Sequence, residues 1–415
     1  MNNNSSDIDL LFAGFLVDEV TFELASKKEP APQHAAHRYQ HSLVRMLKRL
    51  PWASFNVLGT VPASTFPKNS NWLFKPKKWA VSGVEGYVLP IVNFPIIRLL
   101  SRFMGFFIFV LFWYFSRGND KSTKKIIILY ALHTPHLLPI FILRLFLNLK
   151  IIVYIPDLPA YMNAGLNFPF WKSWLKAIDS KILLGMANRV DGRIVITRNM
   201  FDYVNEKHSL VIDSISLKSE LIDDQTNVLD AIASNIGTKY AVYAGGLNNS
   251  NRIKELVGIF LDPRIQSSGL NLVLCGQGTL SQWCLDMASQ TKNVFYLGVL
   301  SNDKVVSLQK DATVLMNLRH TSDIYTKYSF PSKIAEYLQS GVPIMTTRLA
   351  GIPNDLVPYM KIVEDDPVIT LCELLEHYDI AKSNAMHGQK YFMSSRSPDA
   401  QADIILHFIN QIVLE

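Results

Sequence analysis

The sequence predicts an α/β protein with two domains, each built on a parallel sheet. The chain has 415 residues, a length that suggests two domains of about 200 residues each. Hydrophobic residues make up 49% of it and charged residues 18%, which is enough apolar material for two cores. Strand-like and helix-like segments alternate through both halves, as they do where helices connect parallel strands.

In the first half, short apolar segments rich in β-branched residues are expected to be strands, and longer segments between them helices. The expected strands are Phe12–Val17, Phe55–Thr60, Lys125–Tyr130, Ile151–Ile155, Arg193–Thr197 and Leu210–Ile212, and the expected helices are Ala35–Leu50, Ile96–Phe115, Leu137–Leu147 and Trp171–Ala187. This half is predicted to form a first domain over residues 1–215. A polar stretch at 216–238, rich in Asp, Asn and Ser, is the expected interdomain linker.

The second half repeats the same alternation and is predicted to form a second domain over residues 239–397. The expected strands are Tyr240–Tyr243, Asn271–Cys275, Val294–Tyr296, Thr313–Asn317 and Val342–Thr346, and the expected helices are Arg252–Phe260, Leu280–Ala288, Asn302–Asp311 and Ser332–Gln339. The tail, 398–415, is expected to be an amphipathic helix, and it is a candidate to cross back to the first domain.

The three cysteines, Cys275, Cys284 and Cys372, are scattered and form no CxxC or Cys/His cluster. They are expected to be reduced core residues rather than part of a disulfide framework or a zinc site. The N-terminus lacks the basic segment of a signal peptide. These observations favour a cytoplasmic protein.

Positive charge is concentrated in one part of the chain. Residues 51–200 contain 18 Lys and Arg against 5 Asp and Glu, although the net charge of the whole chain is only +6. In the stretch from Trp72 to Trp79, lysines alternate with aromatic and apolar residues, a mixture that suits the headgroup region of an anionic membrane. A solvated basic face over an ordinary core remains the alternative. Nucleic acid is not an expected partner, because the basic residues form no recognised binding motif.

The most apolar run, Phe103 to Phe115, has 13 uninterrupted apolar residues. That is fewer than the roughly 18–20 residues needed to span a bilayer. Arg98 and Arg102 precede it, one helical turn apart. A buried or interfacial helix is therefore expected here, with a transmembrane helix as the alternative.

The segment from Ser329 to Thr347 is the most informative of the chain, and it predicts a loop, a short helix and a strand. Pro331 suits the first helical turn, because its missing N–H would have no partner there. Ser332 and Lys333 lie in that turn, where free backbone amides and the helix dipole attract an anion. Glu336 follows one turn later on about the same face. This arrangement would suit a sugar nucleotide, with phosphates at the helix start and ribose hydroxyls at the carboxylate.

This segment resembles the nucleotide-sugar helix of GT-B glycosyltransferases of the family 4-like (glycosyl transferases group 1) type, in the branch that builds bacterial surface polysaccharides. The resemblance implies two Rossmann-like domains that face each other across a cleft. It also implies that Glu336 hydrogen-bonds the donor ribose, while backbone amides near Ser332 and Lys333 hold the diphosphate. The family pattern has a second glutamate eight residues earlier, where this chain has Tyr328. Retention of configuration is what most similar enzymes show, and Tyr328 leaves that point open here.

The resemblance also implies a glycine-containing turn that faces the donor diphosphate, often with an arginine and a lysine. Gly245 and Gly246 follow an expected strand and precede an expected helix, so they match this turn. Gly246 stands where the arginine would be expected. Arg252 and Lys254 are the nearest cations and are the candidates to neutralise the diphosphate. A plain tight turn is the alternative.

Two further candidates follow strands of the second half. Gly276 begins a G-x-G after Asn271–Cys275, but Ser281 replaces the third glycine of the dinucleotide fingerprint, which argues against NAD. Because similar glycosyltransferases have this unit in the donor domain, Gly276 is assigned to donor binding. Arg319 follows Thr313–Asn317, at the end of a strand where α/β proteins bind ligands, and is a candidate catalytic or phosphate contact. A surface salt bridge is the alternative.

In the first half, Asp157 follows an expected strand at the place where related enzymes have a polar pair facing the transferred sugar. His133 and His136 also follow a strand, and His133 is the candidate acceptor-side base; structural histidines are the alternative. Arg198 begins a strand-to-helix turn similar to one in the family. The chain has no DxD motif in a metal-binding context, so no metal and no cofactor beyond the nucleotide sugar are expected.

The resemblance covers most of the chain and implies a glycosyltransferase. Its expected donor is a nucleotide-diphosphate sugar, and its expected acceptor is a lipid-linked glycan of capsule, O-antigen or exopolysaccharide synthesis. It is expected to bind the inner face of the plasma membrane peripherally, with the first domain facing the lipid. A catalytically silent relative in an assembly complex, which Tyr328 favours, and a nucleotide-sugar epimerase are the alternatives.

Overall fold

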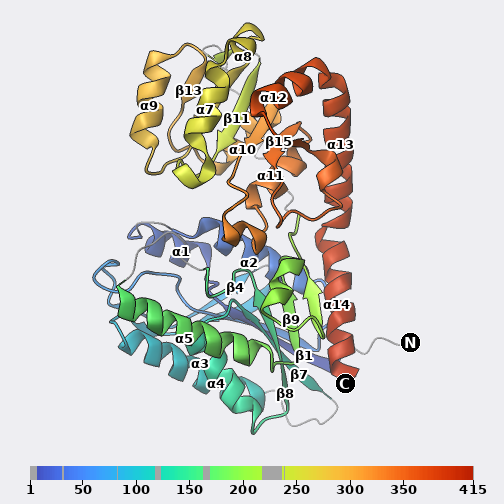
Figure 1. Ribbon diagram of the computed structural model, residues 1–415. Coiled ribbons are helices and arrows are strands. Elements are labelled where there is room, and N and C mark those ends of the chain that lie inside the picture. The colour runs from blue at the N-terminus through green and yellow to red at the C-terminus, as the bar shows by residue number, and fades with distance from the viewer. Residues whose placement is uncertain are drawn as a thin grey trace. The chain divides into compact units, whose positions relative to one another are not determined.

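The computed structural model describes residues 7–29, 32–81, 83–116, 123–161, 169–216, 236–237 and 239–414. The chain divides into two compact units (Figure 1). Unit 1 consists of Met1–Ile215 with Pro398–Glu415, and unit 2 of Ser216–Ser397. Most of the predicted linker at 216–238 lies outside the described residues.

Unit 1 contains an eight-stranded sheet in the order β10-β9-β8-β7-β1-β2-β5-β4. Its strands are β1 (Ile8–Gly14), β2 (Ser54–Gly59), β4 (Lys77–Val81), β5 (Val84–Val88), β7 (Lys124–Tyr130), β8 (Leu149–Ile155), β9 (Gly192–Val195) and β10 (Ser209–Val211). All neighbouring strands are parallel except the edge pair β4–β5. The strand order reverses direction between β1 and β7.

The helices of unit 1 are α1 (Glu19–Ser26), α2 (His34–Leu47), α3 (Ile97–Ser116), α4 (Thr134–Arg144), α5 (Phe170–Ala187), the 3₁₀ turn η2 (Arg198–Asp202) and α14 (Pro398–Leu414). A two-stranded sheet, β3 (Leu73–Phe74) with β6 (Ile91–Val92), lies beside them. The last helix, α14, contacts α2 (Figure 1). Its Ile405, Ile409 and Ile412 pack into the same core as Ile8 and Ile152 of the sheet, so burial of this apolar stripe holds the C-terminus in unit 1.

Most predicted elements of unit 1 are present, but α1 was not predicted, and β1 and the strands near the sheet edge also differ. β1 begins at Ile8 rather than Phe12 and ends at Gly14, because Asp18 caps the next helix by accepting a hydrogen bond from the Thr21 amide at 3.1 Å. The apolar run continues to Val17 because that residue is buried in the turn. The four strands β3, β4, β5 and β6 were not predicted. Lys77 and Lys78 of β4 suit its position at the edge of the sheet, where charge opposes pairing with other chains.

Unit 2 contains a six-stranded sheet in the order β13-β12-β11-β14-β15-β16, with all neighbours parallel. The strands are β11 (Tyr240–Ala244), β12 (Asn271–Cys275), β13 (Val294–Tyr296), β14 (Val314–Asn317), β15 (Ile344–Thr347) and β16 (Lys361–Val363). The α-helices are α7 (Ile253–Leu261), α8 (Pro263–Ser267), α9 (Ser281–Gln290), α10 (Asn302–Lys310), α11 (Ser332–Ser340), α12 (Pro367–Glu376) and α13 (Tyr378–Ser395), and the 3₁₀ turns are η3 (Asn249–Asn251), η4 (Ile324–Lys327) and η5 (Val357–Tyr359).

The sequence predicted β12 and β13 to the residue, and β11, β14, β15 and α11 to within two residues at each end. It did not predict α8, β16, α12 or α13. β16 is short and only half-buried, so it lacks the apolar run that identifies the other strands. The apolar residues of α13 do not form a pronounced stripe on one face, and the helix buries only Ala385, Gly388 and Phe392.

Candidate functional site

The sheet of unit 2 creates a ligand position between β11 and β14. These strands are hydrogen-bonded neighbours, and the chain moves outward from them in opposite directions, to β12 on one side and β15 on the other. Parallel α/β sheets bind ligands in the crevice beyond the carboxyl ends of the strands at such a point. Gly245 follows β11 directly, and Arg319 lies two residues beyond β14.

Lys333, at the start of α11, is positioned by Tyr243 of β11. Its ammonium donates a hydrogen bond to the Tyr243 hydroxyl at 2.5 Å and lies 3.9 Å from the centre of that ring. The Tyr243 hydroxyl in turn donates to the Gly246 carbonyl at 3.0 Å. The glycine turn after β11 and the first turn of α11 are thereby joined through one tyrosine.

Gly245 is needed because the Lys333 side chain passes against its backbone. A Cβ on Gly245 would lie 2.2 Å from Lys333 Cε and 2.3 Å from Nζ, and its φ is +152°. Gly276, whose φ is +123°, packs closely against this turn, so a Cβ there would lie 2.0 Å from the Gly245 carbonyl oxygen. Both glycines therefore allow close backbone approach, which the predicted donor-side turn requires.

The charge at this edge is positive and only partly compensated. Burial, together with the nearby Arg319 and against the opposing effect of Glu336, lowers the pKa of Lys333 to about 7. The Arg319 backbone is held by Thr347, whose hydroxyl accepts from the Arg319 amide at 3.1 Å and donates to its carbonyl at 2.9 Å. Arg319 Nε is buried without a hydrogen-bond acceptor among the described residues. An anion bound here would favour the charged form of Lys333.

The start of α11 presents backbone amides at the same edge. Pro331 is the N-cap residue, and its side chain does not cap the first amides of the helix. Ser332 is exposed, and Glu336 is exposed one turn further along. Tyr328, which stands where the family has its first glutamate, is buried at 6% exposure and packs in the interior.

The other predicted donor cations lie at the start of α7. Arg252, the residue before this helix, forms a short ion pair with Glu255 three residues later. Lys254 is exposed, and its ammonium lies 5.6 Å from the centre of the Trp283 ring. The cations that the structure brings to the Gly245 turn are thus Lys333 and Arg319. Sequence reasoning missed Tyr243, whose only signal is a hydroxyl near the end of an otherwise apolar strand.

The corresponding edge of unit 1, after β7 and β8, contains His133 and Asp157. His133 follows β7 and packs against Phe15 at 5.3 Å and His136 at 4.6 Å between ring centres. Burial, together with nearby Arg102, lowers the pKa of His133 to about 3, so this imidazole is neutral at physiological pH. Asp157 is exposed just beyond the end of β8.

Arg102 of α3 adds buried positive charge to this edge, and sequence reasoning did not select it. It is 3% exposed, donates to the Val61 carbonyl at 3.1 Å, and lies 5.4 Å from the centre of the Phe15 ring. Its Nε is buried without a partner among the described residues. Arg198, by contrast, is exposed at the start of η2.

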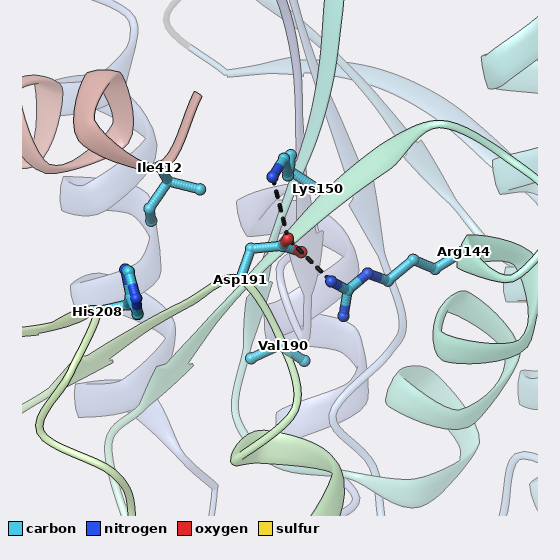
Figure 2. Close-up of a pocket in the computed structure, with 6 residues that line it drawn as sticks. All are labelled: Arg144, Lys150, Val190, Asp191, His208 and Ile412. Atoms are coloured by element: carbon cyan, nitrogen blue, oxygen red, sulfur yellow. Dashed lines mark hydrogen bonds and ion pairs between the residues drawn. The ribbon is translucent and has the colours of Figure 1, made fainter. Parts of the chain in front are cut away.

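A pocket at the opposite end of the unit 1 sheet is occupied by paired charges (Figure 2). Arg144 and Lys150 contact the Asp191 carboxylate at 2.9 and 3.4 Å, and that carboxylate also accepts from the Ile151 amide at 2.8 Å. The pocket lies at the amino ends of β8, β9 and β10, whereas parallel sheets bind ligands at the carboxyl ends. It is therefore a structural ion-pair cluster rather than a candidate active site.

The model of the family described as glycosyl transferases group 1 matches residues 238–368. The search of curated proteins gave no match. Among solved structures, the chain is similar to sucrose-phosphate synthase from Thermosynechococcus elongatus, with 12% identity, TM-score 0.62, and coverage of 98% of this chain and 100% of the other. It is also similar to Anabaena HepE solved with UDP, with 11% identity, TM-score 0.62, and coverage of 97% and 100%.

A third similar structure is WaaG, a glycosyltransferase involved in lipopolysaccharide biosynthesis, with 12% identity, TM-score 0.58, and coverage of 96% of this chain and 99% of the other. These likenesses extend over nearly all of both chains. At such low identity they establish the fold, and the predicted GT-B architecture of two Rossmann-like domains is confirmed.

Proposed function

We propose that the chain is a glycosyltransferase that binds a nucleotide-diphosphate sugar at the carboxyl edge of β11 and β14, within residues 238–368 that match the glycosyl transferases group 1 model. The observation that carries this proposal is the position of Lys333, which Tyr243 holds next to the backbone of Gly245. The ammonium, the Arg319 guanidinium and the first amides of α11 form a positive site for a diphosphate. HepE, a similar structure, was solved with UDP, which supports a nucleotide as the ligand.

The reaction is proposed to depend on stabilising the leaving diphosphate. As the glycosidic bond to the donor breaks, negative charge grows on the β-phosphate, and fixed positive groups stabilise that charge more than they stabilise the intact donor. Lys333 and Arg319 supply those groups, so we propose that transfer needs no divalent metal at the diphosphate. Glu336, on the exposed face of α11 one turn after Lys333, is proposed to accept hydrogen bonds from the ribose.

The acceptor is proposed to be a lipid-linked glycan, because unit 1 exposes a large apolar surface. α4 contacts both α3 and α5, so these helices form one layer. Phe112 of α3 is 73% exposed, and Phe170 and Trp174 of α5 are 87% and 58% exposed. The α3/α5 apolar surface consists of the exposed side chains Leu100, Met104, Ile108, Phe112, Phe170, Trp171, Trp174 and Ile178. Surfaces of this kind bind membranes or partners.

Lysines on α5 support an anionic lipid surface rather than a protein partner. Lys172 and Lys181 are exposed and Lys176 is half-buried on the same helix as the tryptophans, and the Lys172 ammonium lies 5.2 Å from the centre of the Trp171 ring. Aromatic rings at headgroup depth with lysines reaching phosphates are typical of interfacial helices. Similarity to WaaG, which is involved in lipopolysaccharide biosynthesis, agrees with an acceptor of this class.

Binding is proposed to be peripheral, at the cytoplasmic face of the membrane. α3 is long and apolar enough to cross a membrane by length and composition alone, with mean hydropathy 1.7. However, Arg102, Phe106, Val110 and Trp113 form a buried stripe along it. If α3 were inserted across a bilayer, the residues of unit 1 that pack against this stripe would be exposed. We therefore propose that α3 lies on the membrane surface.

The donor assignment is tested by calorimetry against UDP-, GDP-, dTDP- and CMP-linked sugars. One donor is expected to bind, and Glu336→Ala is expected to weaken its affinity by about tenfold. The reason is that ribose hydroxyls left without an acceptor cost about 1–3 kcal/mol of binding free energy. Glu376→Ala, at the end of α12, is the control and should bind as the wild type does. A folded protein that binds none of the donors would refute the proposal, and binding without transfer would point to a silent assembly partner.

The membrane assignment is tested by sedimentation with vesicles of phosphatidylglycerol and phosphatidylcholine. The wild type is expected to sediment with the anionic vesicles, and Trp171→Glu/Trp174→Glu to lose at least about tenfold in partitioning, because apolar area is lost and negative charge is added. Val299→Glu, an exposed apolar position of unit 2, should sediment normally. Equal loss in both variants, or no sedimentation of the wild type, would contradict a lipid-binding role for α5.

A further inference from the structure

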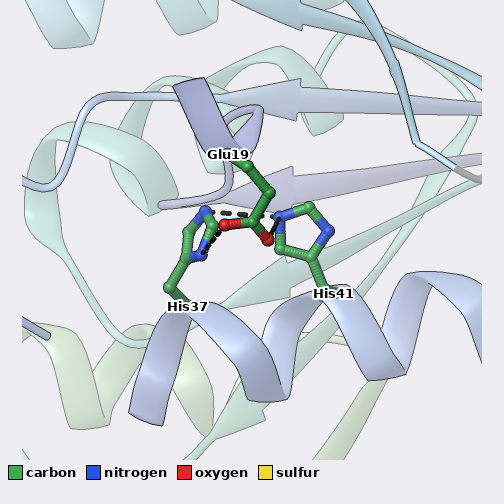
Figure 3. Close-up of side chains that lie close together, drawn as sticks. All are labelled: Glu19, His37 and His41. Carbon is green, nitrogen blue, oxygen red and sulfur yellow. Dashed lines mark hydrogen bonds and ion pairs between the residues drawn. The ribbon is translucent and has the colours of Figure 1, made fainter. Parts of the chain in front are cut away.

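A second group of chemically active side chains lies in unit 1, where α1 and α2 meet (Figure 3). Glu19 begins α1, and His37 and His41 lie one turn apart on the same face of α2. Figure 3 shows the Glu19 carboxylate directed between the two imidazole rings. The proposed donor and acceptor chemistry uses none of these residues.

The distances among the three side chains are those of a metal site. His37 Nε2 and His41 Nε2 are 3.3 Å apart, and His41 Nε2 is 3.7 Å from a Glu19 oxygen. One ligand atom from each residue lies within 4.8 Å of the others. Two nitrogens bound at about 2.0–2.1 Å to one tetrahedral zinc ion lie about 3.3 Å apart. The imidazoles thus already have the separation that shared coordination requires.

The backbone supplies a further oxygen at the same point. The Val17 carbonyl oxygen lies 3.0 Å from His37 Nε2 and 3.1 Å from His41 Nε2. Without a metal, two ring nitrogens converge on a single carbonyl while standing only 3.3 Å from each other. With a metal among them, the nitrogens, the carboxylate and the carbonyl would complete a set of four ligands.

The surroundings keep both imidazoles neutral and in place. His37 is 2% exposed and stacks on Phe22 with ring centres 3.8 Å apart, and His41 is 7% exposed. Burial, followed by the neighbouring His37, lowers the pKa of His41 to about 4, so the form present at neutral pH is the one that binds metals. His41 Nδ1 is buried without a hydrogen-bond partner among the described residues.

We propose that Glu19, His37 and His41 bind one divalent metal ion of the zinc class, through two imidazole nitrogens and a carboxylate. Its role would be structural, joining the start of α1 to α2. The same helix positions the edge of the sheet, because the Gln40 side-chain oxygen accepts from the Phe15 amide at 3.0 Å. A metal at α2 would therefore stabilise the loop that follows β1 in the acceptor-binding unit.

The test is a titration of the chelator-treated full chain with Zn²⁺, in competition with a chromophoric chelator. One equivalent is expected to bind, and His41→Gln and Glu19→Gln are expected to weaken the affinity at least about tenfold, because each removes a ligand. Glu19 is two-thirds exposed, so its substitution leaves the fold intact even if that of His41 does not. His34→Gln is the matched control, an exposed histidine on the same helix.

Cobalt gives a second readout that does not depend on activity. Co²⁺ bound by this set should show the visible absorption of a tetrahedral ion, and Zn²⁺ should raise the midpoint of thermal unfolding in the wild type and in His34→Gln but not in Glu19→Gln. Failure of the folded wild type to bind Zn²⁺ would overturn the proposal, leaving two histidines that donate to the Val17 carbonyl. Equal weakening by His34→Gln would place the metal elsewhere.

Discussion

Lys333→Met is expected to lower kcat/KM for the donor by about 10²–10³-fold. The substitution keeps an unbranched chain of similar length beside Tyr243 while removing the charge that faces the leaving diphosphate. Steady-state transfer with the donor found by calorimetry measures the effect. Lys254→Met, which removes a lysine placed over Trp283 on α7, is the matched control and should change the rate less than about threefold. Equal losses in both variants would show that Lys333 has no special position.

The same lysine predicts how donor binding depends on pH. The pKa of Lys333 is lowered to about 7 in the free protein, chiefly by burial, and a bound diphosphate favours the ammonium. Below pH 7 the ammonium is already present, whereas above pH 7 binding must take up a proton. Donor affinity should therefore fall as the pH rises above about 7. Calorimetry at pH 8 in buffers of different ionisation enthalpy should detect this proton in the wild type and not in Lys333→Met; identical uptake would contradict the assignment.

The lowered pKa also affects stability, with a definite sign. Between pH 7 and the ordinary lysine pKa, the unfolded chain binds a proton that the folded chain does not, so this group's contribution to stability rises with pH across that window. Below about pH 7 the buried ammonium is charged in the folded chain, so its full destabilising effect is present there. A bound donor removes this effect, so ligand-induced stabilisation should be larger at pH 7 than at pH 9.

Gly245→Ala is expected to weaken donor binding by about tenfold or more although every charged residue remains. The new Cβ would lie 2.2 Å from Lys333 Cε, so the lysine must leave its position over Tyr243, and displacements of about 1 Å are enough for losses of this size. A positive φ of +152° adds backbone strain. The measurement is donor affinity by calorimetry, together with the free energy of unfolding in urea.

Gly258→Ala is the control for this substitution. Gly258 lies within α7, and a Cβ there would meet no atom within 4 Å, so alanine should stabilise the helix by roughly 0.5–1 kcal/mol and leave donor binding unchanged. If Gly245→Ala bound the donor normally, the close approach of Lys333 to the glycine turn would have no functional importance.

Local sequence was sufficient for the features that depend on neighbouring residues. Apolar runs identified β12 and β13, and the order Pro331, Ser332, Lys333 identified the start of α11. Strand and helix periodicity and a helix start are encoded within a few residues of each other, because they depend on backbone propensity and on burial of one face. The alternation of these elements also predicted the parallel sheets and hence the edge at which ligands bind.

Contacts between distant residues were decided only by the folded structure. Lys333 meets Tyr243 across 90 positions of sequence, whereas Arg252, nearer to the glycine turn in the chain, pairs with Glu255 instead. Glu19 likewise meets His37 and His41 only because burial of Phe22 brings α1 against α2. Such contacts depend on the order in which strands pair and helices pack, and that order is set by the burial of the whole core rather than by any local pattern.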